Sequence, residues 1–484
     1  MERSNRCLQD TSQDVIADTI SQHVAPTGLN GATTGIATPI MLQSRSREGT
    51  IVRQMLGNTH RLLTTVKAPA YVCRYPESKP IVTNPITGSF PILNHGDVVI
   101  TSNIVAPAKE WRLQSEVLAR HSSWFSRSFQ EPTPEEQYNR PPWFSYTLEL
   151  VHGVAELVRQ PVNGEIPTPK AMDKSVTKVG NTEGLDLPSG GSAFDAACME
   201  TSPLAIIDTY NQILGVFYNI PPLISPGKIN EALLQAEQLI KHASTLHCLH
   251  LIRSHVGNAL LQHRQSLFLA IAADPARWLI LASALQNDSI YTESLTHIIG
   301  AHPSWPWPTK RSTLPASTCH LIARNSARLE TLCLEAEHAL LLLTINVGPR
   351  PVAPQHDSVF ATWFVVATFR DILAREFRAL ELEQRDAPLR RGTMFRKIAR
   401  GGSAYMDYAE MERLIRKVMP CALDSLEEDL GLLKQFSKRY VAELARNELM
   451  IDGEAAGLGY LTCARVGRED IPWRAAGVGE GVVG

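Results

Sequence analysis

Four histidines crowd one short stretch of the sequence, and they are the residues there with the clearest potential for chemistry. They are His242, His247, His250 and His255. A spacing of three residues places His247 and His250 on one side of a helix, where two imidazoles can bind a metal ion. No cysteine or carboxylate completes the set, because Cys248 points away from that side. Surface or packing roles therefore compete with metal binding here, and we expect no bound metal.

Sequence motifs for nucleophilic, metal or nucleotide chemistry are missing. The sequence holds no GxSxG elbow, HExxH pair or P-loop, and no GxGxxG that follows a strand. Its eight cysteines are scattered without a CxxC pair, a pattern typical of free thiols in a reducing compartment. We therefore expect no cofactor and no enzyme activity. An enzyme with a dispersed site in the helical region stays an alternative without a positive motif.

A basic stretch lies in the C-terminal part of the sequence. Its charged residues are Arg385, Arg390, Arg391, Arg396, Lys397 and Arg400. Such a stretch is typical of a nuclear-localisation signal or an anion-binding patch, or simply of a solvated segment between helices, which we expect here. The glycines of Gly401-Gly402-Ser403 follow, and they fit either phosphate binding or the end of a helix.

The overall composition narrows the class of protein. Of 484 residues, 44% are hydrophobic and 20% charged, which is ordinary for a globular chain. Lys and Arg total 47 against 49 Asp and Glu, and this balance argues against a dedicated nucleic-acid binder. The N-terminus lacks the apolar run of a secretory signal, and no apolar run reaches the roughly 18–20 residues that span a bilayer. We expect a cytoplasmic or nuclear protein without membrane or nucleic-acid partners.

Ordered structure is expected to begin near Asn94. Residues 1–90 are rich in small polar residues and cannot bury enough apolar surface to offset their chain entropy, so we predict that most of them are disordered. Runs of β-branched or alternating residues then predict three strands, with an amphipathic helix that starts at Ser115 before the third. The predicted strands are 97–101, 109–114 and 144–151.

The rest of the chain is predicted to be helical. A flexible insertion rich in Pro, Gly and Lys is expected at about 160–201. Helical periodicity resumes at Pro203 and continues through a helical extension at 264–345. A proline-rich linker is expected at 346–356, followed by a C-terminal helical region at 357–475. The predicted class is α+β, a small sheet with helices followed by a mostly helical C-terminal region.

Several segments resemble the BTB/POZ domain beyond this order of elements. They are Gly96–Ile100, Trp111–Phe125, Leu204–Tyr218 and 229–262. They are similar, in turn, to that family's opening strand, its second strand with the first helix, its helix ending in an aromatic residue, and its closing helical hairpin. The resemblance implies a BTB/POZ domain at 94–263.

The resemblance is closer to the filamentous-fungal group of BTB proteins and extends over most of residues 94–475. The further segments that carry it are Phe268–Ala272, Trp278–Leu279, Tyr291–Gly300, Tyr460–Cys463 and Glu469–Trp473. The family often has a basic residue at the position of Ser115, paired with the strand aspartate that is Asp97 here. This chain therefore carries Asp97 without that basic partner.

The resemblance implies that the first helix packs on its twin in a second chain. Independently, this helix carries more apolar surface than one small sheet can cover, and such an excess usually meets a partner. The candidate interface residues are Asp97, Val117, Leu118, His121, Trp124, Phe125 and Phe129. The expected function is non-catalytic: homodimerisation and binding of an unknown protein partner. The alternative is a substrate adaptor that binds a cullin scaffold of a ubiquitin ligase near Tyr218.

Overall fold

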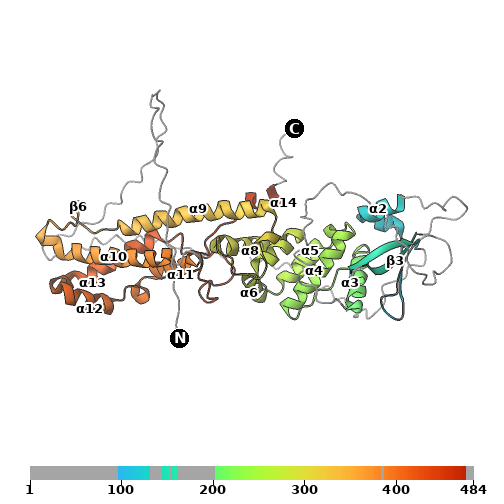
Figure 1. Ribbon diagram of the computed structural model, residues 1–484, viewed down its shortest axis with the longest axis horizontal. Helices are drawn as coiled ribbons and strands as arrows, with labels where there is room; N and C mark the ends of the chain where they lie inside the picture. Colours follow the sequence, from blue (N-terminus) through green and yellow to red (C-terminus); the bar gives the residue numbers. More distant parts are fainter. Residues whose placement is uncertain (1–95, 131–143, 152–153, 161–201, 383–385, 476–484) are drawn as a thin grey trace, which may run out of the picture.

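The computed structural model describes residues 96–130, 144–151, 154–160, 202–382 and 386–475. The molecule is elongated: a small sheet lies at one end, and helices follow one another along the long axis to the other end (Figure 1). The fold is mixed α+β, in agreement with the predicted class. The predicted disorder of 1–90 and, apart from Gln160, the predicted insertion lie outside the described residues.

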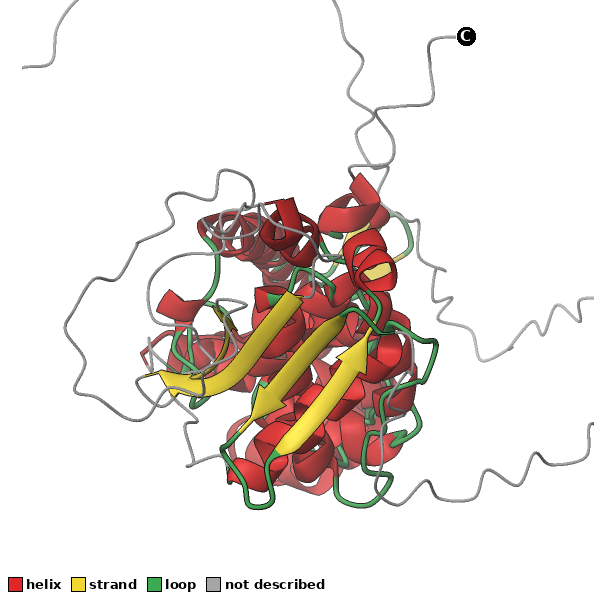
Figure 2. Ribbon diagram, turned by 90° about the vertical axis from the view of Figure 1, so that its right-hand side faces the viewer, coloured by secondary structure: helices red, strands yellow, loops and turns green. Residues whose placement is uncertain are grey.

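The sheet has four strands in the order β2-β1-β3-β4, with helices packed behind it (Figure 2). The strands are β1 Val98–Ser102, β2 Lys109–Leu113, β3 Phe144–Val151 and β4 Val154–Gln160. β1 runs parallel to β3, and the other neighbours are antiparallel. The first three strands confirm the sequence prediction, whereas β4 was not predicted.

The side chains of β1, in the interior of the sheet, alternate between its two faces. Val98 and Ile100 point into the core and are fully buried, with Val99 between them on the other face. Their register partners Leu113 and Trp111 on β2 are buried on the same side. The period of two thus specifies the register, because a slip by one residue would turn this apolar set outward.

The predicted first helix is in fact two helices, α1 Ser115–His121 and α2 Ser123–Gln130. They are separated at Ser122, whose backbone is extended (φ −138°). The Ser122 hydroxyl donates to the Leu246 carbonyl at 2.6 Å and accepts the N–H of Phe125 at 3.1 Å. A buried serine that starts a helix and binds a distant carbonyl explains the break, which no local pattern had indicated.

Six helices form the middle of the molecule. They are α3 Pro203–Val216, α4 Ile229–Thr245, α5 Leu249–Leu261, α6 Gln265–Ala273, α7 Pro275–Leu285 and α8 Asp288–Ala301. Local signals explain several of their ends. Proline occupies the first position of α3 and α7, and the side chain of Asn287 caps α8 by accepting the N–H of Ile290.

The C-terminal region is also helical. Its main elements are α9 Ala316–Leu341, α10 Phe360–Leu382, α11 Ala387–Arg400, α12 Tyr408–Val418, α13 Leu423–Tyr440 and the short α14 Pro472–Ala475. Within the predicted linker lies a hairpin, β5 Asn346–Val347 with β6 Arg350–Pro351.

The basic stretch predicted as a segment between helices is helix α11 from Arg390 to Arg400, and this corrects the prediction; Arg385 lies outside the described residues. Gly392, Phe395 and Ile398 recur at helical spacing and are buried, so the helix has an apolar side. The many basic residues of this stretch had hidden the helical spacing of its apolar residues in the sequence.

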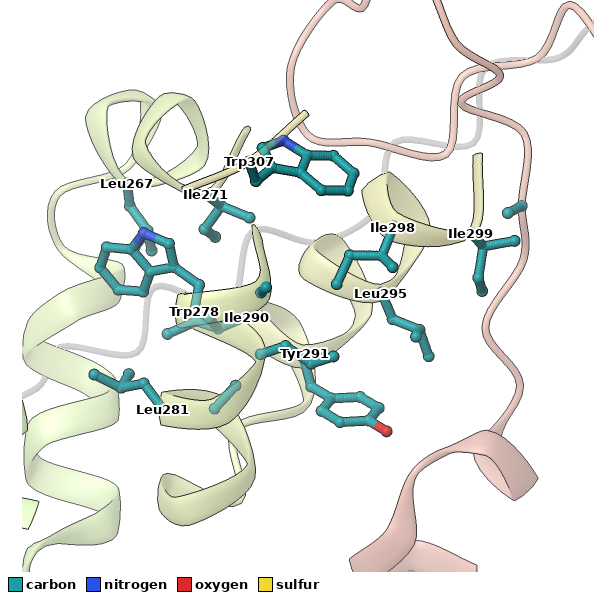
Figure 3. Close-up of a cluster of buried hydrophobic side chains, with 14 of the residues drawn as sticks. Leu267, Ile271, Trp278, Leu281, Ile290, Tyr291, Leu295, Ile298, Ile299 and Trp307 are labelled. Carbon is teal, nitrogen blue, oxygen red and sulfur yellow. The ribbon is translucent and has the colours of Figure 1, made fainter. Parts of the chain in front are cut away.

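One hydrophobic cluster runs from Val98 to Ile471, so the predicted regions share a core. Its middle is built around Trp278 on α7, Tyr291 on α8 and Trp307 in the loop before α9 (Figure 3). In the described part of the chain, no single helix is long and apolar enough to cross a membrane. Only α6 and α7 together would pass that criterion, and they are bent by 118° from each other.

Candidate functional site

The first candidate site is the surface of α1 and α2, which is positioned by Asp97 at the start of β1. The Asp97 carboxylate accepts the backbone N–H of Ser115 at 2.7 Å and also accepts the Ser115 hydroxyl. Ser115 is the first residue of α1, so the residue directly before β1 satisfies a free N–H at the start of this helix. Ser115, in place of a basic residue, thus gives Asp97 a neutral partner.

A group of aromatic rings fixes α2 on the sheet. Phe125 packs edge-on against Phe217, directly after α3, at 6.1 Å between ring centroids and stacks with Phe129 at 5.7 Å. Phe129 in turn lies 4.4 Å from Phe144 of β3. Trp124 meets Phe125 edge-on at 4.8 Å. Contacts of this kind add to the free energy gained by burying the rings and hold α2 rigidly.

Two predicted interface residues belong to the interior instead. Leu118 and Phe125 are both 0% exposed, so neither can reach a second chain in this fold. This corrects the prediction, and the reason is that α1 and α2 turn these side chains toward the sheet and α3. The other candidates are partly exposed: Asp97, Val117, His121, Trp124 and Phe129. We call Val117, His121, Trp124 and Phe129 the α1–α2 surface.

The four histidines do not converge on one site. His242 is buried against the ring of Tyr210 at 5.0 Å, and burial lowers its pKa to about 4. His247 contacts Ser123 and Arg127 of α2, each at 2.9 Å from its Nδ1. His250 and His255 are exposed. Among the described residues, no group of three or more potential ligands could hold a metal ion.

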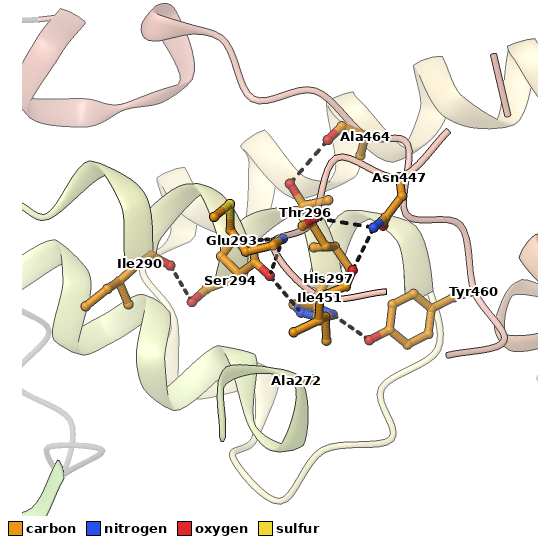
Figure 4. Close-up of polar contacts among 12 residues, drawn as sticks. Ala272, Ile290, Glu293, Ser294, Thr296, His297, Asn447, Ile451, Tyr460 and Ala464 are labelled. Carbon is orange, nitrogen blue, oxygen red and sulfur yellow. Dashed lines mark hydrogen bonds and ion pairs between the residues drawn. The ribbon is translucent and has the colours of Figure 1, made fainter. Parts of the chain in front are cut away.

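The second candidate is a buried polar cluster of Glu293 and His297 on α8 with Tyr460 from the C-terminal segment (Figure 4). The Tyr460 hydroxyl lies 2.6 Å from His297 Nδ1. The Met450 N–H is donated to the Glu293 carboxylate at 3.0 and 3.1 Å. His297 Nε2 lies 3.9 Å from the Glu293 carboxylate and forms no hydrogen bond within the described chain.

Burial dominates the protonation of this polar cluster. It raises the pKa of Glu293 to about 7, against the lowering effect of the Met450 N–H, and it lowers the pKa of His297 to about 4. Burial also raises the pKa of Tyr460. Glu293 is 3% exposed and His297 0%, so a substrate has no access to them. The cluster therefore holds the C-terminal segment on α8. Both segments are among those that carry the resemblance, but the resemblance did not predict that they are in contact.

The basic residues of α11 are used inside the chain. Arg391 forms ion pairs with Glu330 and Glu337 of α9. Arg396 donates to the Tyr460 carbonyl at 3.0 Å and to the Leu458 carbonyl. Their guanidinium groups thus hold α9 and the C-terminal segment in place, which accounts for part of the basic stretch without an external anion.

The glycine pair after α11 ends that helix. Gly401 has φ 67° and follows the last helical residue, as expected for a helix terminator. The Lys434 ammonium group donates to the carbonyls of Gly402 at 2.6 Å and Met406 at 2.8 Å. The loop therefore presents carbonyl oxygens to an internal cation, which is the opposite of a phosphate site.

Comparisons with known proteins add no family to these observations. No protein-family model, no curated protein and no solved structure matches the chain. A function is therefore inferred from the geometry of the α1–α2 surface and the buried polar cluster.

Proposed function

We propose that this protein is a non-catalytic interaction protein of the BTB/POZ type, whose α1–α2 surface binds a second copy of the chain. The observation that carries the proposal is a pair of short helices, held on the sheet by Phe125, that leaves Val117 of α1 and Trp124 of α2 partly exposed. Apolar side chains on a rigid support are what a protein interface needs at its centre.

The arrangement around this surface supports the proposal. The resemblance implies two strands, a helix, a third strand and a closing helical hairpin, and β1, β2, the α1–α2 pair, β3 and the α4–α5 hairpin follow one another in that order. The rest of the described chain packs onto this unit through α6, α7 and α8. The helical region would then present a surface to a further protein partner in the cytoplasm or nucleus.

The test is the molar mass of the full chain, measured by light scattering after size exclusion. The wild type is expected to be larger than a monomer at micromolar concentration, and Val117→Asp to lower that mass while its circular dichroism stays unchanged. Leu414→Asp, at a 42% exposed site on α12, is the matched control and should leave the mass unchanged. A wild type that stays monomeric, or equal masses for both variants, would contradict the proposal.

A second candidate function, the cullin adaptor, is favoured by an exposed apolar loop after α3. Ile220 is 40% exposed and Leu223 77%, directly after Tyr218. Purified cullin scaffold would be titrated into the full chain and into the Leu223→Asp variant. Binding that the substitution abolishes would support the adaptor function, whereas no binding to the wild type would remove it.

A further inference from the structure

Helix α9 lies along one long edge of the molecule (Figure 1), and one of its faces is exposed within the described part of the chain. The helix has 26 residues and is therefore about 39 Å long. One side of it, with Ile322, Leu329 and Cys333, is buried in the core. The opposite side is exposed over the whole length, and its residues recur at intervals of three and four.

A positive and a negative residue lie on the two sides of Thr331 at the centre of this face. Arg328 precedes Thr331, and Glu335 follows it, and all three are exposed. Within the described residues, Arg328 and Glu335 form no ion pair. Arg324 and Glu330, in contrast, are bound to Asp470 and Arg391 of the same chain. The two charged groups at the centre of the face are thus left for an external partner.

A large and a small apolar residue also lie on the two sides of Thr331 along this face. Leu334 is 55% exposed and lies three residues after Thr331. Ala327 is exposed and lies four residues before it, on the same side of the helix. A second α9 that ran antiparallel, with Thr331 on the two-fold axis, would place Leu334 over Ala327 of the other copy. The same register would place Arg328 beside Glu335 of the other copy.

We propose that the exposed face of α9 is a second self-association surface, which binds the α9 of another copy in antiparallel orientation around Thr331. The two-fold axis makes every favourable contact occur twice, so the charge pattern and the Leu334–Ala327 pair are both self-complementary. This surface is separate from the α1–α2 surface, which lies at the end of the molecule that carries the sheet (Figure 1). Two different two-fold contacts on one chain assemble it beyond a dimer.

The experiment is charge exchange in the full chain that also carries Val117→Asp, so that the α1–α2 surface does not contribute. Sedimentation at low ionic strength would compare four proteins: this background, the background with Glu335→Arg, with Arg328→Glu, and with both exchanges. Each single exchange turns two attractive contacts into repulsive ones and should weaken self-association roughly tenfold or more. The double exchange should restore it. Glu427→Arg, on the exposed side of α13, is the matched control and should have no effect.

The outcomes separate this proposal from the proposed function. A background protein that is monomeric, single exchanges without effect, or a double exchange that fails to restore association would each overturn the α9 proposal. If Val117→Asp leaves the mass unchanged while Glu335→Arg lowers it, the α9 surface stands and the α1–α2 interface falls.

Discussion

Arg277 on α7 donates Nε and Nη2 to the two carboxylate oxygens of Glu237 on α4, each at 2.6 Å. Glu237 is 7% exposed, so its charge is almost removed from water and depends on this guanidinium group. The pair joins the BTB-like region predicted at 94–263 to the helical extension predicted at 264–345. The two regions are therefore held together by a directed polar contact as well as by the shared core.

Loss of this guanidinium group should destabilise the whole chain. Arg277→Ala leaves a buried carboxylate without its partner and should reduce the free energy of unfolding by about 2 kcal/mol. The measurement is denaturant unfolding. Arg375→Ala removes an exposed i,i+4 pair with Asp371 and should cost only about 0.5 kcal/mol or less. Equal effects of the two substitutions would refute a special role for the Glu237 pair.

The buried polar cluster should make stability depend on pH in a characteristic way. Because the folded pKa of Glu293 is about 7, against 4.5 when exposed, its contribution is fully present below pH 4.5 and is lost as the pH rises toward 7. His297 is opposite: its folded pKa of about 4 lies below 6.5, so its contribution is present above pH 6.5 and is lost toward pH 4. Between these pH limits, the stability that Glu293 loses as the pH rises is offset by the stability that His297 gains.

Glu293→Gln removes one of these slopes and keeps an acceptor for the Met450 N–H. The variant should gain stability relative to the wild type by about 3 kcal/mol as the pH rises from 4.5 to 7.5. Chemical unfolding at a series of pH values measures this difference. If the difference stays constant over that range, Glu293 does not titrate as its buried position implies.

Close packing of the C-terminal segment should make two glycines intolerant of a side chain. A Cβ at Gly300 of α8 would overlap the Leu461 carbonyl oxygen, and one at Gly392 of α11 would overlap the carbonyl of Tyr460. Gly392→Ala should therefore cost about 2–3 kcal/mol of stability through overpacking. Gly431→Ala in α13, with open space at its Cβ, should instead stabilise by about 0.5–1 kcal/mol. Thermal unfolding of both variants tests the contrast.

Asp97 should act as a cap of α1 contributed from outside the helix. Asp97→Ala removes the acceptor of the Ser115 N–H and should cost about 1–2 kcal/mol. Ser115→Ala keeps that N–H bond and loses only the hydroxyl contact, so a smaller loss is expected. Urea unfolding of the two variants gives the comparison, and a larger loss for Ser115→Ala would exclude the capping role.

Local pattern in the sequence was enough for the α+β class, for β1 to β3 and for most helices. Strand alternation, the helical period and start signals such as Pro203 act between neighbouring residues, so the sequence displays them directly. Helix α11 was missed because its many arginines hid the spacing of Gly392, Phe395 and Ile398.

Tertiary structure alone decided which residues are available and which are committed to the interior. Apolar Leu118 and Phe125 looked like interface residues, and only the packing of α1 and α2 on the sheet shows that they are core. His297 and Tyr460 lie 163 residues apart, and no periodicity links them. Such contacts depend on the order in which whole elements stack, a non-local property that local pattern does not carry. The sequence determined the elements, and their packing determined the surfaces left for a partner.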